Sequence, residues 1–165
     1  ELAKDFPQVQ FLWVGGKPEA VAGWKTVIDN LALKNIQLTG FIPNEQLPLY
    51  QAVGEILLMP FGKSVSGSSG GDTAEVCSPL KMFEYMAAGR AILTSDLPVL
   101  REVLNENNAL FYAIEDYDDL KAKFTLLMGD KELRDKLASQ ARTDVVQYTW
   151  HERMQKVLKR FNEVS

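Results

Sequence analysis

The chain has 165 residues, of which 46% are hydrophobic, and this is enough for one domain with a sizeable core. A formal net charge of -4 argues against a nucleic-acid partner, because such binding needs a basic surface that follows the phosphates. The single cysteine, Cys77, excludes an internal disulfide. The chain shows no signal peptide and no apolar run near the roughly 20 residues of a membrane span, so we predict a cytoplasmic location.

The chain opens with a helix-like pattern and a first strand. Glu1 stands where an initiator methionine would, so we expect the chain to be a piece of a longer protein. Residues 9–16 are a β-rich run that ends at Gly15 and Gly16, as expected for a strand that leads into a turn. The glycine pair fits a phosphate cradle and a simple tight turn equally well, because the full Gly-x-Gly-x-x-Gly spacing is missing.

A helix and a second strand follow. Pro18 opens a predicted helix that reaches about Leu33. We interpret its apolar stripe as core, and the stripe comprises Val21, Trp24, Ile28 and Leu31. The second strand is predicted over residues 36–43, and Asn44 is expected to cap a helix that runs to Val53.

Residues 55–61 are apolar almost throughout, which predicts a strand buried on both faces of a parallel sheet. The next stretch, residues 62–77, is rich in glycine and serine. Long loops inside compact domains are often binding loops or lids, and an ordinary surface insertion is the alternative. Because this loop leads directly into the next helix, we predict a lid that orders when a ligand binds.

The helix over residues 78–89 carries the most informative pattern. Ser78 is predicted to cap it, Pro79 to occupy its first position, and Gly89 to end it in a left-handed conformation. Its apolar side is expected to comprise Leu80, Phe83, Met86 and Ala87. Lys81 and Glu84 share a face near the helix N-terminus, which attracts anions through its free amides. This pattern indicates a phosphate site, with a solvated Lys–Glu pair as the alternative.

The remaining chain continues the alternation of strands and helices. We predict strands at 91–94 and 109–112 and helices at 99–104, 118–128, 131–147 and from 149 onward. The whole pattern predicts an α/β fold with a doubly wound, Rossmann-like parallel sheet flanked by helices. Counting the predicted strands gives about five to six strands in this sheet. Ligands of such sheets lie beyond the carboxyl ends of the strands. We therefore expect the strand ends at Gly15, Ile42, Phe61 and Thr94 to gather with the Ser78 helix.

Three other features lack the partners that a site needs. We interpret His151, the single histidine, as a surface or capping residue. Cys77 has no second cysteine and no histidine near it in the sequence, so we interpret it as a loop residue. We interpret Glu115, Asp116, Asp118 and Asp119 as acids that complement a helix start and not as metal ligands.

The motif Ser-Pro-x-Lys-x-x-Glu-Tyr-Met-Ala at Ser78–Ala87, with Ser95–Pro98 and Arg101–Val103 after it, resembles the nucleotide-sugar-binding segment of GT-B glycosyltransferases. The resemblance is to the retaining, group 1 branch that includes glycogen and sucrose synthases, and it runs from about Phe11 to Phe161. It implies that residues 1–165 are a single donor-binding, C-terminal domain. The acceptor-binding, N-terminal domain is expected to lie outside the chain.

The resemblance also implies roles for single residues. Lys81 would neutralise the donor diphosphate, and Glu84 would accept hydrogen bonds from the ribose hydroxyls, which makes them the candidate catalytic residues. Gly40, Phe41 and Ile42 would border the base. The full set of implied donor-binding residues is Gly15, Gly16, Gly40, Phe41, Ile42, Glu75, Ser78, Pro79 and Leu80. Many relatives carry a sugar-contacting glutamate where this chain has Val76, and Glu75 beside it is the candidate substitute.

The implied reaction is transfer of a sugar from a UDP- or GDP-linked donor to an acceptor, with retention at the anomeric carbon, as in polysaccharide biosynthesis. Neither a metal nor another cofactor is required by this scheme, and no nucleic acid takes part. The acceptor would be a carbohydrate or a lipid-linked molecule held by the absent domain. Membrane association of the whole protein is therefore possible under this scheme. The chain alone is expected to be inactive. The alternatives are a GT-B-type nucleotide-sugar epimerase and a non-enzymatic, nucleotide-binding Rossmann-like module.

Overall fold

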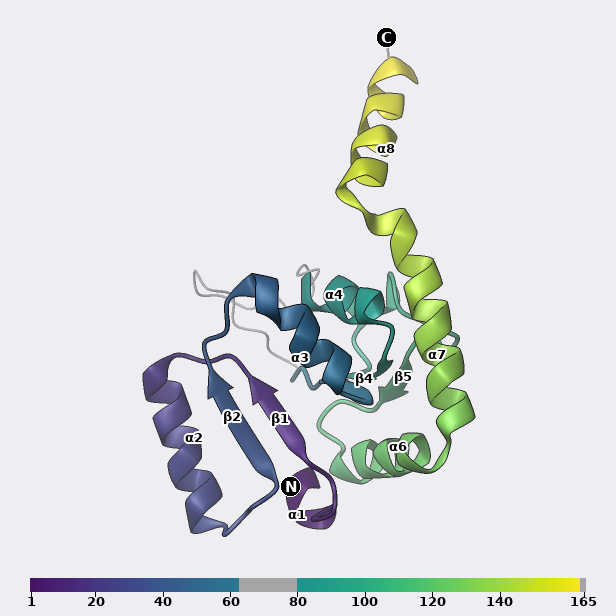
Figure 1. Cartoon of the computed structure of the whole chain (residues 1–165). Coiled ribbons are helices and arrows are strands. Elements are labelled where there is room, and N and C mark those ends of the chain that lie inside the picture. The colour runs from purple at the N-terminus through teal and green to yellow at the C-terminus, as the bar shows by residue number, and fades with distance from the viewer. Residues whose placement is uncertain (63–79, 164–165) are drawn as a thin grey trace. The chain divides into compact units, whose positions relative to one another are not determined.

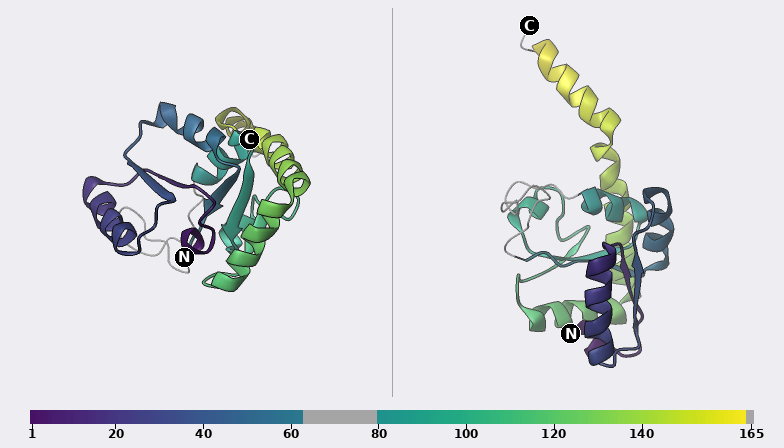
Figure 2. Two further views of the ribbon diagram at one scale, coloured as in Figure 1. Left: turned by 60° about the horizontal axis from the view of Figure 1, so that its bottom comes forward. Right: turned by 90° about the vertical axis from the view of Figure 1, so that its left-hand side faces the viewer.

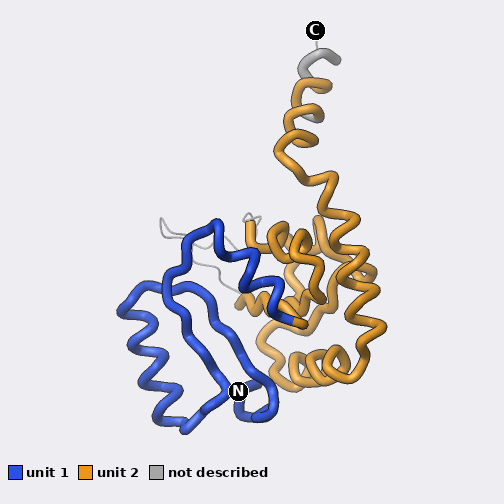
Figure 3. Tube along the Cα trace, in the orientation of Figure 1, with its two compact units in different colours: residues 1–54 blue, residues 55–165 orange. Residues whose placement is uncertain are grey.

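A computed structural model of the chain describes residues 1–62 and 80–163 (Figure 1). The chain divides into two compact units, unit 1 (residues 1–54) and unit 2 (residues 55–165) (Figure 3). Residues 63–79 lie outside the described part, and with them most of the predicted lid, Glu75, Cys77, Ser78 and Pro79. What was predicted for these residues therefore stays a prediction.

Unit 1 is built on two parallel strands. Its elements are α1 (Leu2–Asp5), β1 (Phe11–Val14), α2 (Pro18–Asn30), β2 (Ile36–Gly40), the 3-10 helix η1 (Asn44–Gln46) and α3 (Leu47–Val53). Pro18 occupies the start of α2 as predicted. Asn44 is the first residue of η1, whose N-cap is Pro43, and α3 begins three residues later with Gln46 as its N-cap, so the predicted cap at Asn44 was wrong.

The predicted core stripe of α2 is not buried. None of the helix residues is fully buried, and the side chains of Trp24 and Leu31 are 47% and 58% exposed. Trp24 packs on Trp13 of β1 with the ring centroids 4.9 Å apart. A sheet of two strands offers too little surface to cover the whole stripe, so the interpretation as core was wrong at these positions.

Unit 2 contains the larger sheet. Its elements are β3 (Ile56–Met59), α4 (Leu80–Ala88), β4 (Ala91–Ser95), α5 (Pro98–Arg101), β5 (Leu110–Tyr112), α6 (Tyr117–Gly129), α7 (Lys131–Asp144), the 3-10 helix η2 (Val145–Tyr148) and α8 (Trp150–Glu163). The strands are parallel in the order β3-β4-β5. The five strands confirm the predicted parallel α/β fold, but in the described chain their pairing forms two sheets and not a single one.

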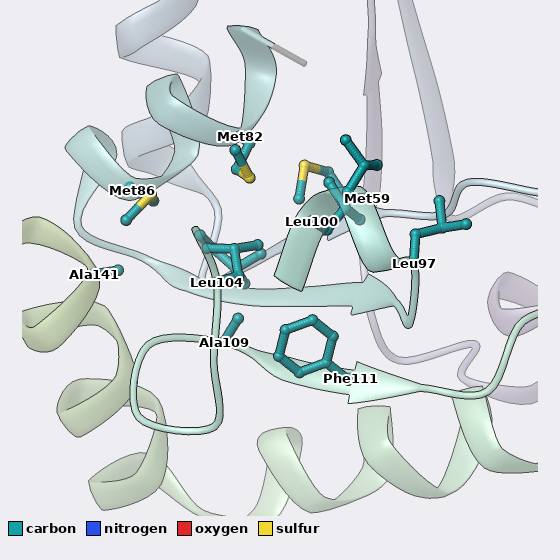
Figure 4. Close-up of a cluster of buried hydrophobic side chains, with 11 residues drawn as sticks. Met59, Met82, Met86, Leu97, Leu100, Leu104, Ala109, Phe111 and Ala141 are labelled. Atoms are coloured by element: carbon teal, nitrogen blue, oxygen red, sulfur yellow. The ribbon is translucent and has the colours of Figure 1, made fainter. Parts of the chain in front are cut away.

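Helices cover both faces of the three-stranded sheet. In Figure 4, α4 lies on one face of β4 and β5, and α6 lies on the other. The core cluster on the α4 side comprises Met59, Met82, Met86, Ile92, Leu97, Val99, Leu100, Leu104, Ala109, Phe111 and Ala141. All five residues of β4 are buried. In β3, buried and half-buried residues alternate, so the predicted burial of this strand on both faces holds only in part. Figure 2 shows α8 extending away from the rest of unit 2.

The orientation of α4 corrects the predicted apolar side. Met82 and Met86 are fully buried in the core, whereas Leu80 is 68% exposed and Ala87 is also exposed. The prediction was right for Met86 and for Phe83, which packs partly on the core, and wrong for Leu80 and Ala87. Gly89 ends the helix as predicted, with φ of +63° and its N–H donating to the Met86 carbonyl at 3.2 Å.

Two of the four acidic residues at the start of α6 have structural roles there, as predicted. Asp116 caps the helix by accepting from the Asp119 N–H at 2.9 Å, and the Asp119 carboxylate accepts from the Ala113 N–H at 2.7 Å. In the described part of the chain, no group of three or more histidine, cysteine or acidic residues is placed to hold a metal ion. His151 is exposed, which confirms its predicted surface position. Among residues 1–62 and 80–163, no helix has both the length and the apolar character needed to span a bilayer.

Candidate functional site

In unit 2 the parallel topology brings the start of α4 to the edge of the sheet where the strands end. The chain leaves β3 at this carboxyl edge and enters the parallel strand β4 from the opposite edge. The helix between them must therefore run back across the sheet, and Figure 4 shows Met82 nearer the carboxyl end of β4 than Met86. The first turn of α4 thus lies where open α/β sheets bind their ligands.

Lys81 and Glu84 lie on the exposed side of this helix. Both side chains are exposed, and they stand three residues apart, which places them on one face. The opposite face is anchored by the fully buried Met82 and Met86. Tyr85, which is half-buried, has a raised pKa because burial disfavours its phenolate and because Glu84 adds a negative charge nearby. The helix therefore presents a cation and a carboxylate from a rigid support.

Two polar residues tie the strand ends of unit 2 together: Thr94, which was expected among the gathering strand ends, and Ser95, which had no predicted role of its own. Thr94 and Ser95 are fully buried at the end of β4. The Thr94 hydroxyl donates to the Met59 carbonyl at 3.2 Å, and Ser95 Oγ accepts from the Phe61 N–H at 3.0 Å. The sequence signal was a polar pair at the end of the apolar run of the predicted strand. These bonds join the end of β3 to β4.

An ion pair beyond β4 was also missed. Arg101 donates to both carboxylate oxygens of Asp96, at 2.7 Å from Nε and 2.9 Å from Nη2, and it also pairs with Glu106. Its guanidinium lies 3.6 Å from the centroid of the Phe111 ring. The hydrogen bonds from Arg101 lower the pKa of Asp96 and raise that of the arginine. Because Arg101 contacts Asp96, Glu106 and the Phe111 ring of β5, the cluster is suited to holding α5 on the sheet.

We expect this ion pair to make stability depend on pH. The lowered pKa means that Asp96 contributes stability above the pKa of the unfolded chain, about 4, and that this contribution is lost as the pH falls through the folded value. The variant Asp96→Asn should lower the free energy of unfolding at neutral pH by about 1 kcal/mol or less, since exposed pairs are screened. In urea unfolding, the difference from wild type should shrink as the pH falls below about 4, and a difference that does not change with pH would contradict the assignment.

In unit 1 the predicted glycines lie together at the carboxyl ends of β1 and β2. Gly15, Gly16 and Gly40 have φ of +101°, +108° and +69°, values that favour glycine. The Gly15 N–H donates to the Gly40 carbonyl at 2.9 Å. Phe41 is 78% exposed and Ile42 is half-buried. The glycine pair after β1 and the Gly40–Ile42 stretch, which are far apart in the sequence, are thus joined by a backbone hydrogen bond.

The expected gathering of strand ends is therefore present within each unit. Phe61 and Thr94 meet the neighbouring strand ends in unit 2, and Gly15 meets the end of β2 in unit 1. Leu80 is exposed at the start of α4, beside Lys81. The roles in donor binding and catalysis that the resemblance implies for all these residues stay predictions.

The comparison with protein families decides the class of the protein. A family model described as "Glycosyl transferase-like" matches residues 1–159. The chain belongs to this family. Two curated relatives are 33% identical to it: the putative teichuronic acid biosynthesis glycosyltransferase TuaH of Bacillus subtilis over 98 residues, and the N,N'-diacetylbacillosaminyl-diphospho-undecaprenol alpha-1,3-N-acetylgalactosaminyltransferase of Campylobacter jejuni over 87 residues. These matches cover 59% and 52% of this chain but only 22% and 23% of the relatives, so the chain spans under a quarter of their length.

Solved structures of glycosyltransferases share the fold. Sucrose-phosphate synthase from Thermosynechococcus elongatus matches with a TM-score of 0.75 and 19% identity over 99% of this chain and 42% of its own. Anabaena HepE in complex with UDP matches with a TM-score of 0.72 and 18% identity over 96% and 43% of the two chains. The C-terminal domain of a group 1 family glycosyl transferase from Francisella tularensis, LpcC, matches with a TM-score of 0.61 and 14% identity over 88% and 90%. The predicted fold, that of the C-terminal domain of GT-B glycosyltransferases, is confirmed.

Proposed function

We propose that this member of the glycosyl transferase-like family binds a nucleotide-sugar donor and, as part of a larger enzyme, transfers the sugar to an acceptor with retention of configuration. The observation that carries the proposal is the pair Lys81 and Glu84, exposed on the anchored helix α4 at the carboxyl edge of a parallel sheet. A cation and a carboxylate at such an edge match the two polar parts of a nucleotide diphosphate. These parts are the anionic phosphates and the ribose hydroxyls.

Lys81 is assigned to the phosphates. Its ammonium group in the first turn of α4 adds to the positive end of the helix dipole. In the transfer step the bond between the sugar and the diphosphate breaks, and the leaving group gains negative charge. A positioned cation and backbone N–H groups stabilise that charge, so the scheme needs no metal ion.

Glu84 is assigned to the ribose. A carboxylate accepts hydrogen bonds at both oxygens and can hold two neighbouring hydroxyls at once. Its position one turn after Lys81 suits a ligand whose ribose follows the diphosphate. In unit 1, Gly40, Phe41 and Ile42 are proposed to border the base, and the exposed ring of Phe41 supports contact with a ligand.

The compared proteins support the class of donor and acceptor. HepE, which shares the fold, is described in complex with UDP, and this favours a uridine donor. The Campylobacter relative is named for a diphospho-undecaprenol acceptor, and the Bacillus relative for teichuronic acid biosynthesis. We propose a carbohydrate or lipid-linked acceptor, held by parts of the enzyme that this chain does not include.

A titration of the chain with UDP, GDP and ADP tests the proposal. We expect one nucleotide, with UDP favoured, to shift the amide NMR signals of residues 80–84 and 40–42 in a saturable way. Signals from α7, which carries none of the proposed site residues, are the internal control. If no nucleotide shifts residues 80–84 at millimolar concentration, the donor-binding role of this chain is contradicted.

A further inference from the structure

The pairing of β1 with β2 contains a bulge beside the glycines of unit 1. Trp13 is paired with Leu38, but the next residue of β1, Val14, is paired with Gly40. Thr39 is therefore an extra residue on β2 with no counterpart on β1. Bulges of this kind redirect a side chain, and they are frequent next to functional sites.

The Thr39 side chain forms hydrogen bonds to both glycines at the strand ends. Thr39 Oγ1 accepts from the Gly15 N–H at 3.3 Å and donates to the Gly40 carbonyl at 2.9 Å. The same Gly15 N–H also donates to the Gly40 carbonyl at 2.9 Å. The hydroxyl thus supports both partners of the bond that joins the two strand ends, and it is partly shielded from solvent.

The backbone that Thr39 supports has room for a ligand. A Cβ atom added to Gly15 or to Gly40 would meet no described atom within 4 Å, so the space beside both residues is open. Both residues also have positive φ, at which the peptide groups adopt orientations that other residues rarely reach. Glycine in such a place commonly allows a ligand to approach the main chain closely.

We propose that Thr39 is a positioning residue for nucleotide binding, which acts through the backbone of Gly15 and Gly40. This inference rests on the proposed function, since it names a residue that prepares the backbone proposed to contact the nucleotide in unit 1. The hydroxyl does not contact the ligand. It holds the two strand ends in one arrangement, so that the open main chain of unit 1 is already in place when the nucleotide arrives.

The test compares variants of the full 165-residue chain. Thr39→Val keeps the shape and removes the hydroxyl, and Thr39→Ser keeps the hydroxyl. We expect Thr39→Val to raise the Kd for UDP roughly three- to ten-fold, the range of one ordinary hydrogen bond, and Thr39→Ser to stay within about two-fold of wild type. Thr26→Val is the matched control, because Thr26 also donates to a main-chain carbonyl, that of Ala22 at 3.1 Å, but within α2.

The outcomes distinguish a failure of the Thr39 inference from a failure of the proposed nucleotide binding. Urea unfolding is measured alongside binding, because a purely structural role of Thr39 would lower stability and leave the Kd of the folded chain unchanged; that result overturns the inference. Equal weakening by Thr39→Val and Thr39→Ser overturns it too. If the wild-type chain binds GDP or ADP and not UDP, the same variants are compared with that nucleotide. If it binds none of the three, the proposed function fails first and this inference with it. Should Thr39→Val not fold, Thr39→Cys replaces it, since a thiol keeps the size and weakens the hydrogen bond.

Discussion

Replacing Lys81 with alanine is expected to weaken UDP binding roughly ten- to a hundred-fold, because hydrogen bonds to charged groups contribute about 1.5–3 kcal/mol. Glu84→Gln keeps the size of the side chain and removes its charge, and it should weaken binding roughly five- to thirty-fold, or about 1–2 kcal/mol, because the amide keeps one acceptor oxygen. Both residues are exposed, so the folded chain should keep its stability within about 0.5 kcal/mol. Isothermal titration calorimetry of each variant, with urea unfolding in parallel, measures both quantities.

Exposed charges elsewhere in unit 2 provide the matched controls. Lys136→Ala and Glu132→Gln make the same changes on α7, where both side chains are also exposed. These variants should bind UDP as wild type does, because a loss of net charge acts weakly at a distance in salt. If they weaken binding as much as the α4 variants, the effect is one of net charge, and the assignment of Lys81 and Glu84 to the site is contradicted.

Truncation of Met86 to alanine is expected to cost about 2–5 kcal/mol of unfolding free energy, the range for large-to-small changes in a packed core. Met86 is fully buried and belongs to the cluster that also includes Met82 and Ala141. Removing its side chain leaves a cavity under α4, since the neighbours cannot close fully around it. Urea unfolding followed by circular dichroism measures the loss.

A second truncation on the same helix is the control. Leu80→Ala removes an apolar side chain that is 68% exposed, so the free energy of unfolding should change by only about 0.5 kcal/mol or less. The sequence pattern places Leu80 and Met86 on the same apolar side of α4, so it predicts similar losses for the two variants. The structure buries only Met86, so it predicts a large loss for Met86→Ala and a small one for Leu80→Ala. Similar losses for both variants would show that α4 packs differently.

The positions of the elements were predictable because they depend on local chemistry. Runs of apolar residues mark β3 and β4, Pro18 marks the start of α2, and Gly89 marks the end of α4. The exposed face with Lys81 and Glu84 was also predictable, because charged side chains seldom lie in a core. The candidate site on α4 therefore follows from the sequence, apart from the capping residues that lie outside the described chain.

The failures have a common physical cause. The α2 stripe was expected to be buried, but a helix pattern reports only that apolar residues share a side, not whether a partner surface covers them. The choice of Leu80 and Ala87 for the apolar side of α4 failed because the direction of the sheet from the helix is a property of the packed unit. Propensity and periodicity contain no information about that direction.

By itself, the sequence thus determined the class of fold, the order of its elements and the charged pair on α4, since each depends on residues close together in the chain. Only the tertiary structure decided which side of α4 faces the core, how Arg101 engages Asp96 and Phe111, and how the bulge at Thr39 joins Gly15 to Gly40. These features depend on pairing register and on contacts between elements. A one-residue change in register would redirect every later side chain of a strand, and no local pattern specifies it.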